Sequence, residues 1–494
     1  MDNIKDIEKY FWKAIERIRG GIEPTNYQYK ILGLIFLRYL SDRFDEIYKK
    51  LSLASDQGAN PEDPDEYIAL GALYLPEKTR WSFFKKNITN PEIGFIIDKA
   101  MIEIQNLKSD WRGCLPDGYG APDINPRQIS ELIEIISTIN AVGNSSDIWI
   151  DLFEFVLSIF PEERGKSTGE FYSPQSIVEL TIKTLAPEKG RIYDPCCGSG
   201  GMFTEVNRYM HTNHGDINRV SFYGQEQNPN TVKLTTMNLA MQDIDAIIGT
   251  GNIFENDNFP ELKADYIVAN PPFNCSWNPE NLWNDKRWIY GIPPARNANY
   301  AWLQHCLSKL SPEGTTAVIL PNGSLNSGSG SESEIRRRMI ENGNIECIAA
   351  LPSNLFFNTS IPVSLWILSK NNRKKEILFI NAAKLGEMAT RRIRKLTPDD
   401  ISLISHTYQT WKNEDNNYKD VNGFCKSISV DEVIANSCSL LPSIYVDIEE
   451  EDKDTISFDE KMNHLTQKLS EQFARNNELE KNIRQELKQL GYEL

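Results

Sequence analysis

The sequence predicts an α/β fold, because from about Trp149 onward short runs rich in β-forming residues alternate with helical patterns. Residues 1 to about 148 instead repeat apolar residues every three or four positions, which is typical of a helical bundle. From about 457 to 490 the pattern is that of one long, charged helix. We therefore expect a helical domain at 1–148, a Rossmann-like α/β domain at 149–447, and at 448–494 an acidic linker followed by a coiled-coil-like helix.

The helical domain contains two clear apolar repeats. The first consists of Ile4, Ile7, Phe11, Ile15 and Ile18, and the second extends from Tyr27 to Phe44. Asp, Pro, Gly and Asn are frequent between Ser55 and Glu66, which predicts a surface loop there.

Strands of a parallel sheet with crossover helices are expected in the α/β domain. The runs that predict them are 191–193, 220–224, 264–269, 315–320 and 345–351. A glycine-rich turn, the acidic Glu226 and the motif that starts at Asn270 each follow one of these strands directly. Because ligands bind at the carboxyl ends of strands in open α/β sheets, we expect these three features to form one site.

The predicted C-terminal helix has a heptad-like apolar seam. The seam consists of Met462, Leu465, Leu469, Leu479, Ile483 and Leu490, and polar residues interrupt it. Such a helix would be marginally stable alone. Packing against its own chain and a coiled-coil contact with a partner are equally consistent with this pattern.

Composition and charge limit the class of protein. The 494 residues are 40% hydrophobic and 25% charged, as in globular proteins. No apolar run approaches the roughly 20 residues that span a bilayer, so we expect a cytoplasmic protein with no membrane association. The eight cysteines and five histidines show no metal-ligand spacing, so we expect reduced thiols and no metal site. A net charge of −16 disfavours a protein that grips DNA alone.

The glycine-rich turn predicts a cofactor loop. Ser199, Gly200 and Gly201 allow close approach of a ligand to backbone N–H groups at a helix start. Neither the dinucleotide spacing nor the phosphate-loop ending is present, which disfavours NAD and ATP. Asp194, which begins the turn, suits an ammonium group such as that of S-adenosylmethionine. Glu226 suits the two hydroxyls of a ribose, by analogy with dinucleotide folds.

Two further segments are expected to contact the same cofactor. Asn252 follows the run 246–248 and is a candidate contact on the adenine side. The segment Glu170, Phe171, Tyr172, Ser173, Pro174 and Gln175 precedes the sheet. Ser173 has the residue type of a helix cap, with Pro174 at the first helical position. The two aromatic residues beside the glycine-containing stretch 165–169 are expected to close over the methionine part of the cofactor.

The motif Asn270-Pro271-Pro272-Phe273 predicts the chemistry. A planar amine on a base is a poor nucleophile because its lone pair is delocalised. Accepting its two hydrogens on the Asn270 side-chain oxygen and the Pro271 carbonyl would turn the lone pair toward a sulfonium methyl group. Phe273 would stack on the base, a contact worth roughly 1–3 kcal/mol. These residues together predict methyl transfer to an amino group.

The chain resembles the modification (methyltransferase) subunit of type I restriction-modification systems. The stretches that carry this resemblance are Tyr27–Tyr39, Thr168–Pro174, Leu320–Gly323, Leu351–Phe356 and Ile361–Pro362, together with the motifs above. The resemblance implies N6-methylation of a flipped adenine in DNA with S-adenosylmethionine. It also implies a complex of two such subunits with one specificity subunit that reads double-stranded DNA, to which restriction subunits are added.

Alternatives remain open at this point. The same four-residue motif occurs in enzymes that methylate guanine N2 in RNA or glutamine in proteins, and the chain could also be a non-catalytic, cofactor-sensing assembly subunit. The basic patch Thr390–Lys395 is more typical of a solvated loop than of a DNA contact, with a phosphate contact as the alternative.

Overall fold

The structure is a computed structural model. It describes residues 4–20, 24–108, 111–139, 145–164, 173–280, 282, 284–328, 330–357, 359–370, 372, 374–413, 417–446, 462, 466–467, 469–470, 472–476, 479–481 and 483–484. The chain forms two compact units, Met1–Val446 and Asp447–Leu494. In the second unit the described residues are helical and exposed, and the rest of the predicted helix at 457–490 lies outside the described residues.

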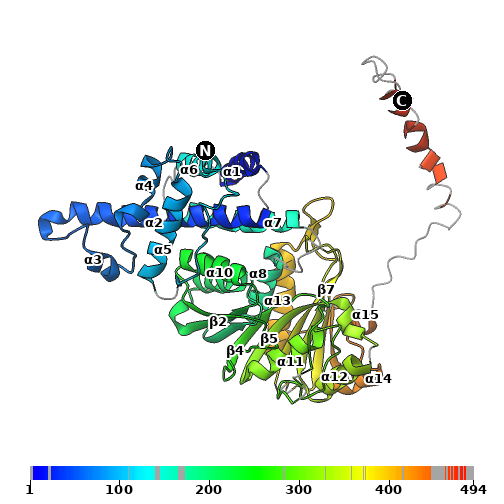
Figure 1. The fold of residues 1–494 in the computed structure, drawn as a ribbon. Coiled ribbons are helices and arrows are strands. Elements are labelled where there is room, and N and C mark those ends of the chain that lie inside the picture. The colour runs from blue at the N-terminus through cyan, green and yellow to red at the C-terminus, as the bar shows by residue number, and fades with distance from the viewer. Residues whose placement is uncertain are drawn as a thin grey trace. The chain divides into compact units, whose positions relative to one another are not determined.

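Helices build the N-terminal part, as predicted (Figure 1). They are α1 (Ile4–Arg19), α2 (Pro24–Leu53), α3 (Pro64–Ala69), α4 (Trp81–Lys86), α5 (Ile93–Leu107), α6 (Pro126–Thr138) and α7 (Ser145–Arg164). The 30-residue helix α2 lies at the centre, where residues 27–37 are all buried. It packs against α4, α6, α7 and α10 (Pro229–Met241), which explains why its apolar residues are not limited to one face.

The loop predicted between Ser55 and Glu66 is partly helical. Ser55–Gln57 form the 3-10 helix η1, and α3 begins at Pro64 because the Asp63 side chain accepts a hydrogen bond from Asp65 N at 3.0 Å. Asp63 and Pro64 therefore form a helix start rather than a loop, as a capping residue followed by proline does.

The predicted boundary between residues 148 and 149 falls inside α7 (Ser145–Arg164). Trp149 is fully buried, and its Nε1 donates to Asp42 Oδ2 of α2 at 2.8 Å. Leu152, Phe153 and Val156 belong to the same apolar cluster as the N-terminal helices. In packing, the first two-thirds of α7 thus belong with the helical part.

A nine-stranded sheet forms the α/β part. Its strands are β1 (Gly190–Asp194), β2 (Val220–Glu226), β3 (Ala246–Thr250), β4 (Ala264–Ala269), β5 (Leu310–Pro321), β6 (Ile345–Ala350), β7 (Val363–Ser369), β8 (Glu376–Asn381) and β11 (Cys425–Ser429). Their order is β11-β8-β6-β7-β5-β4-β1-β2-β3. The two short strands β9 (Glu387–Met388) and β10 (Arg394–Lys395) form a separate hairpin.

The sheet is mixed rather than purely parallel, which corrects the expectation from sequence. All five predicted strands are present, but β7 runs antiparallel to β5 and β6, and β11 runs antiparallel to β8. The segment between β6 and β7 contains no helix in its described residues, so the chain returns in the opposite direction.

Helices cover both faces of the sheet, as Figure 1 shows. One face packs against α8 (Gln175–Leu185), α9 (Gly201–Thr212), α10 (Pro229–Met241) and α13 (Pro398–Lys412). The other packs against α11 (Asn299–Lys309), α12 (Gly330–Glu341), α14 (Val430–Ala435) and α15 (Pro442–Tyr445). Two 3-10 turns, η5 (Ile217–Arg219) and η6 (Asn322–Asn326), lie beside strands, and η2 (Glu77–Thr79) precedes α4.

The strand order places a switch point between β1 and β4. From β1 the chain moves outward through β2 to β3, and from β4 it moves the other way to β5. The crossovers on the two sides therefore diverge, which leaves a crevice at the carboxyl ends of β1 and β4. Asp194, Glu226 and Asn270 stand at or just after strand ends on this edge, as predicted.

Candidate active site

A cavity of about 810 Å³ lies at this edge of the sheet. The predicted site residues that line it are Ser173, Gln175, Asp194, Ser199, Gly201, Glu226, Asn252, Asn270 and Pro272. Pro174, Gly200, Pro271 and Phe273 were predicted as well but do not line it. Glu170, Phe171 and Tyr172 lie outside the described residues. Five separate segments of the prediction thus meet around one cavity.

Asp194 ends β1 beneath the glycine-rich turn. It is 2% exposed, and its Oδ1 accepts a hydrogen bond from Cys196 N at 3.0 Å. Burial raises the pKa of Asp194 to about 7, against the lowering effect of the hydrogen bonds from Cys196. A buried carboxyl group that lines a cavity is stabilised as an anion when a cation binds beside it.

The glycine-rich turn is held from behind by α10. Gly200 has φ +85° and is the N-cap of α9. The left-handed backbone favours glycine, and a Cβ there would lie 3.2 Å from side-chain atoms of Thr235 and Leu239, which would have to move slightly to admit it. Thr235 Oγ1 donates to Gly198 O, and Asn238 Nδ2 donates to Ser199 O at 2.9 Å. Gly200 therefore shapes the turn, while Ser199 and Gly201 face the cavity.

Glu226 is held in a fixed orientation by two backbone amides. Gly198 N donates to Oε2 at 3.1 Å, and Asn228 N donates to Oε1 at 2.8 Å. Each carboxylate oxygen can accept more than one hydrogen bond, so these two leave acceptor capacity for a diol. The carboxylate also ties the glycine-rich turn to the end of β2.

Asn252 lines the cavity, but its side-chain oxygen is used within its own turn. Oδ1 accepts a hydrogen bond from Phe254 N at 3.0 Å. Ile253 and Phe254, which the sequence reasoning did not select, line the cavity as well, and both are buried. These two large apolar residues directly follow Asn252 in the sequence, and this pattern could have indicated an apolar surface for a flat ligand.

The Asn270 amide is oriented by Ser173. Its Nδ2 donates to Ser173 Oγ at 2.8 Å, whereas its Oδ1 is buried without a hydrogen-bond partner among the described residues. The residue type of Ser173 suggested that it caps α8, with Pro174 at the first helical position. This was wrong: Pro174 is the N-cap, and the helix begins at Gln175. An unpaired buried acceptor costs about 1–3 kcal/mol, so a donor is expected to complete this site.

The segment after Asn270 is fixed by a pair of asparagines. Asn274 has φ +53°. Its backbone N donates to Asn299 Oδ1 at 3.1 Å, and Asn299 Nδ2 donates back to Asn274 Oδ1 at 2.9 Å. Phe273 is 9% exposed and lies edge-on to Phe356, with ring centroids 5.3 Å apart. The Phe273 ring therefore contacts another aromatic ring rather than the cavity.

Comparison with known proteins agrees with this arrangement. The family model described as N-6 DNA methylase matches residues 144–454, and the HsdM N-terminal domain model matches residues 7–136. The chain belongs to the N-6 DNA methylase family. Within this family it groups with the methylase subunits of type I restriction enzymes, as the motifs predicted.

Two relatives illustrate the match. The HindI methylase subunit of Haemophilus influenzae is 44% identical, over 71% of this chain and 80% of that protein. The MjaIX methylase subunit of Methanocaldococcus jannaschii is 34% identical, over 99% of this chain and 92% of that protein. The type I methyltransferase subunit from Streptococcus thermophilus shares the fold, with a TM-score of 0.78, 22% identity, and coverage of 90% of this chain and 100% of that chain.

The cavity of this methylase subunit is also lined by residues that were not predicted from the sequence. Gln28 of α2 and Leu157 of α7 line the cavity, so the helical part contributes to its wall. Cys275, Ser276 and Trp277 extend the lining beyond Pro272, and Trp302 lines the cavity as well. The Phe254 ring has centroid distances of 5.2 Å to Trp277 and 4.7 Å to Trp302. Trp277 could have been predicted as a lining residue because it lies close to Phe273 in the sequence. No sequence motif near Gln28 indicates that it lines the cavity.

Two features are absent from the described residues. None of their helices combines the length and the apolar character that a bilayer crossing requires. No group of three or more His, Cys, Asp or Glu side chains among them is arranged to hold a metal ion.

Proposed function

We propose that this methylase subunit transfers the methyl group of S-adenosylmethionine to N6 of an adenine in DNA. The observation that carries the proposal is the Asn270 amide. Asn270 lines the cavity, its side-chain nitrogen donates to Ser173 Oγ, and its buried oxygen has no hydrogen-bond partner in the part of the chain that the structure describes. An amide held in this way presents an acceptor, and an exocyclic amine is the donor that matches it.

The residues around the cavity fit such a cofactor. Asp194 supplies a buried carboxylate for the ammonium group, and Glu226 supplies two oriented oxygens for the ribose hydroxyls. Ile253, Phe254 and Trp302 supply apolar and aromatic surface for the adenine ring. When bound, S-adenosylmethionine supplies an electrophilic methyl group on a sulfonium. Asn252, with its side-chain oxygen already engaged, is proposed to shape this subsite.

The protein activates the amine by orientation. Asn270 Oδ1 and the Pro271 carbonyl would accept hydrogen bonds from the two N–H groups of N6, which would draw the nitrogen toward tetrahedral geometry and direct its lone pair at the methyl group. The methylated nitrogen would then release one of its two protons to solvent. Correct alignment of two reactants lowers a barrier by as much as ~7–11 kcal/mol, so no strong base is required. The adenine leaves the duplex at a cost of a few kcal/mol, which aromatic stacking offsets.

Phe273 and Phe356 form the proposed aromatic contact for the flipped base. The two rings meet edge-on, with centroids 5.3 Å apart, and are 9% and 2% exposed, so stacking on a base requires the Phe273 ring to turn toward the cavity. Pro272, which lines the cavity beside them, adds a rigid apolar surface. Glu170, Phe171 and Tyr172, as well as Gln175, are proposed to complete the cofactor side.

Target selection is proposed to come from partner subunits. A net charge of −16 leaves little electrostatic attraction for duplex DNA, whose binding relies on phosphate neutralisation. We propose a complex of two copies of this chain with one specificity subunit, joined by restriction subunits for cleavage. The exposed apolar residues Met462, Leu469 and Ile483 of the C-terminal unit are the proposed contact with the specificity subunit.

A labelling experiment tests the function. The chain is co-expressed with the specificity subunit expected to be encoded beside it and is incubated with labelled S-adenosylmethionine and DNA, and the product is digested to nucleosides. We expect label in N6-methyladenine only when both subunits are present. Label in RNA or protein, or in DNA without the partner, would favour the alternative substrates.

The Asn270→Ala variant is expected to bind the cofactor but transfer no label. Undiminished transfer would contradict the role proposed for the Asn270 amide.

A further inference from the structure

A small basic hairpin rises from the same edge of the sheet as the cavity. It consists of β9 (Glu387–Met388), the turn 389–393 and β10 (Arg394–Lys395), and it follows the carboxyl end of β8. Because β8 runs parallel to β6 and β6 runs in the same direction as β5 and β4, the hairpin leaves the sheet at the edge where Asn270 follows β4.

The turn of this hairpin is well ordered by its own hydrogen bonds. Ala389 N and Thr390 N donate to Ile393 O at 2.9 and 3.1 Å. Thr390 Oγ1 accepts from Arg392 N at 3.2 Å and from Ile393 N at 3.0 Å. Arg391 and Arg392 are therefore presented on a preformed turn, and both are exposed. Preformed backbone lowers the entropy that binding costs.

The base of the hairpin is connected to the catalytic motif. Arg394 N donates to Asn354 O at 2.8 Å, and Asn354 lies two residues before Phe356, whose ring meets Phe273. Arg394 also anchors the hairpin, since its Nη1 donates to Leu385 O and Gly386 O at 3.0 and 3.1 Å. The turn is thus fixed relative to the ring proposed to contact the flipped base.

The charges of the hairpin are not all balanced internally. Lys395 pairs with Glu387 at 3.4 Å, but neither Arg391 nor Arg392 has an ion-pair partner among the described residues. The exposed arginines of α12 behave differently. Arg337 Nη2 lies 2.6 Å from Glu334 and Arg338 Nε lies 2.7 Å from the same carboxylate, so that pair is neutralised locally.

We propose that the β9–β10 hairpin binds the phosphate backbone of duplex DNA beside the adenine to be methylated, through Arg391 and Arg392. The inference rests on the proposed function, since it places DNA at the Asn270 edge. Guanidinium groups match phosphate oxygens in geometry and charge. Contacts of this kind position a duplex without reading its sequence, which agrees with sequence recognition by a separate subunit.

The test uses the assembled complex with the specificity subunit. The double variant Arg391→Ala/Arg392→Ala is compared with Arg337→Ala/Arg338→Ala on α12 as the matched control, and with Arg391→Lys/Arg392→Lys, which keeps the charge. Affinity for a duplex is measured over a range of salt concentrations. The slope of log affinity against log salt is expected to fall in magnitude by about 0.9 for each phosphate contact removed. The lysine variant and the α12 variant should retain the slope.

The readouts separate this proposal from the proposed function. Affinity should fall about equally for target and non-target duplexes, while cofactor binding measured without DNA stays unchanged. An unaltered salt slope in the alanine variant would overturn the hairpin proposal even if the complex methylates adenine normally. A reduced methylation rate with an unaltered salt slope would also overturn the hairpin proposal, because the hairpin would then affect the reaction only by positioning Phe356. Failure of the unmodified complex to label adenine would instead contradict the proposed function.

Discussion

In the proposed mechanism, Ser173 decides which end of the Asn270 amide faces the incoming base. Removing its hydroxyl in Ser173→Ala deletes the 2.8 Å hydrogen bond from Asn270 Nδ2 and lets the amide rotate. A hydrogen bond of this type contributes about 0.5–1.5 kcal/mol, so we expect kcat to fall by roughly two- to tenfold. Steady-state kinetics with varied S-adenosylmethionine measures the effect.

The conservative variant Ser173→Thr is the control, because it keeps a hydroxyl at the same position and should restore kcat. If Ser173 served only as a cofactor contact, Ser173→Ala would raise the KM for S-adenosylmethionine and leave kcat unchanged. That result would contradict the positioning role.

Asp194 makes cofactor binding depend on pH. Its pKa is raised to about 7 by burial, so below pH 7 the free protein holds a proton on the carboxyl that must attract an ammonium group. Binding of the cation then requires loss of this proton. Affinity for S-adenosylmethionine should therefore rise with pH up to about 7 and level off above it, with a change of at most about tenfold per pH unit below the pKa.

Titration calorimetry from pH 5.5 to 8.5 measures this dependence, with buffers of different ionisation heat to count the released proton. Asp194→Asn, which cannot ionise, should bind more weakly and with a flat profile. The assignment to Asp194 would be wrong if Asp194→Asn kept the same pH dependence as the unmodified chain.

At the residue scale, sequence position predicted the groups that follow strands. Asp194, Glu226 and Asn270 each end or follow a run of β-forming residues, and parallel topology brings such positions together. The role of Ser173 was not predictable, because its partner is 97 positions away. Gln28 was equally hidden, since only the packing of α2 places it at the cavity.

At the scale of elements, α10 sets the shape of the cofactor turn. Gly200 combines a φ of +85° with a tight space, in which a Cβ would lie 3.2 Å from side-chain atoms of Thr235 and Leu239. Gly200→Ala should cost about 1–2 kcal/mol of stability from the left-handed backbone alone. It should also weaken S-adenosylmethionine binding, because the turn has to move away from α10. Urea unfolding and calorimetry measure the two effects.

Gly330→Ala, at the start of α12, is the matched control, since a Cβ there meets nothing within 4 Å. Its stability should stay the same or increase by up to about 1 kcal/mol. Equal behaviour of the two variants would show that the Gly200 backbone is not constrained as described.

The elements themselves were predictable to different degrees. Strand β4 was found with its observed bounds, Ala264–Ala269, because it is a continuous run of β-forming residues. The direction of β7 could not be predicted, because a strand's orientation depends on the connection from β6 and not on the strand's composition. The start of α3 at Pro64 was missed because proline and aspartate are signals for both turns and helix starts.

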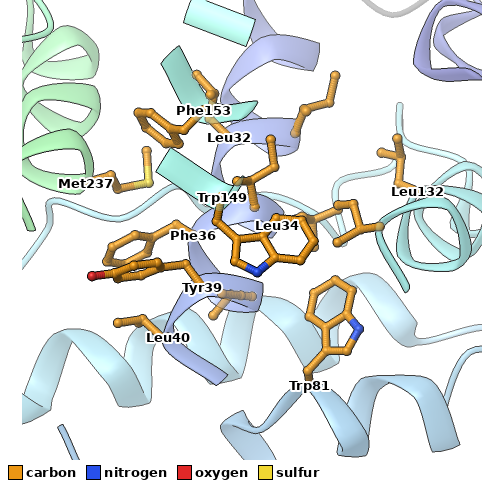
Figure 2. Packing of buried hydrophobic residues seen from close by; sticks show 14 of the residues in the cluster. Leu32, Leu34, Phe36, Tyr39, Leu40, Trp81, Leu132, Trp149, Phe153 and Met237 are labelled. Carbon is orange, nitrogen blue, oxygen red and sulfur yellow. The ribbon is translucent and has the colours of Figure 1, made fainter. Parts of the chain in front are cut away.

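At the scale of the whole molecule, one apolar cluster joins the helical part to the sheet. It contains Leu234, Met237 and Met241 of α10 together with residues of α2 and α7. Figure 2 shows Met237 directed toward the aromatic side chains of the helical part, among them Phe36 and Phe153. Such a shared cluster explains why a change of sequence character at Trp149 does not coincide with a break in packing.

Polar contacts along the same seam contribute less. Arg43 pairs with Asp243 at 2.8 Å, but the two side chains are 31% and 67% exposed, and surface ion pairs contribute about 0–1 kcal/mol. Tyr39 Oη donates to Met241 O at 2.8 Å, which fixes the register of α2 on α10. Apolar burial is therefore expected to dominate the energy of the seam.

Met237→Ala tests this coupling across the molecule. Met237 is fully buried, and truncation of a buried methionine costs about 2–5 kcal/mol. Because the cluster belongs to both parts, we expect amide protons of α2 and of β1 to lose hydrogen-exchange protection together. Leu403→Ala on α13, where the side chain is 46% exposed, should change protection in neither. Loss of protection in α2 alone would mean that the helical part unfolds independently and that the cluster does not couple it to the strands around the cofactor site.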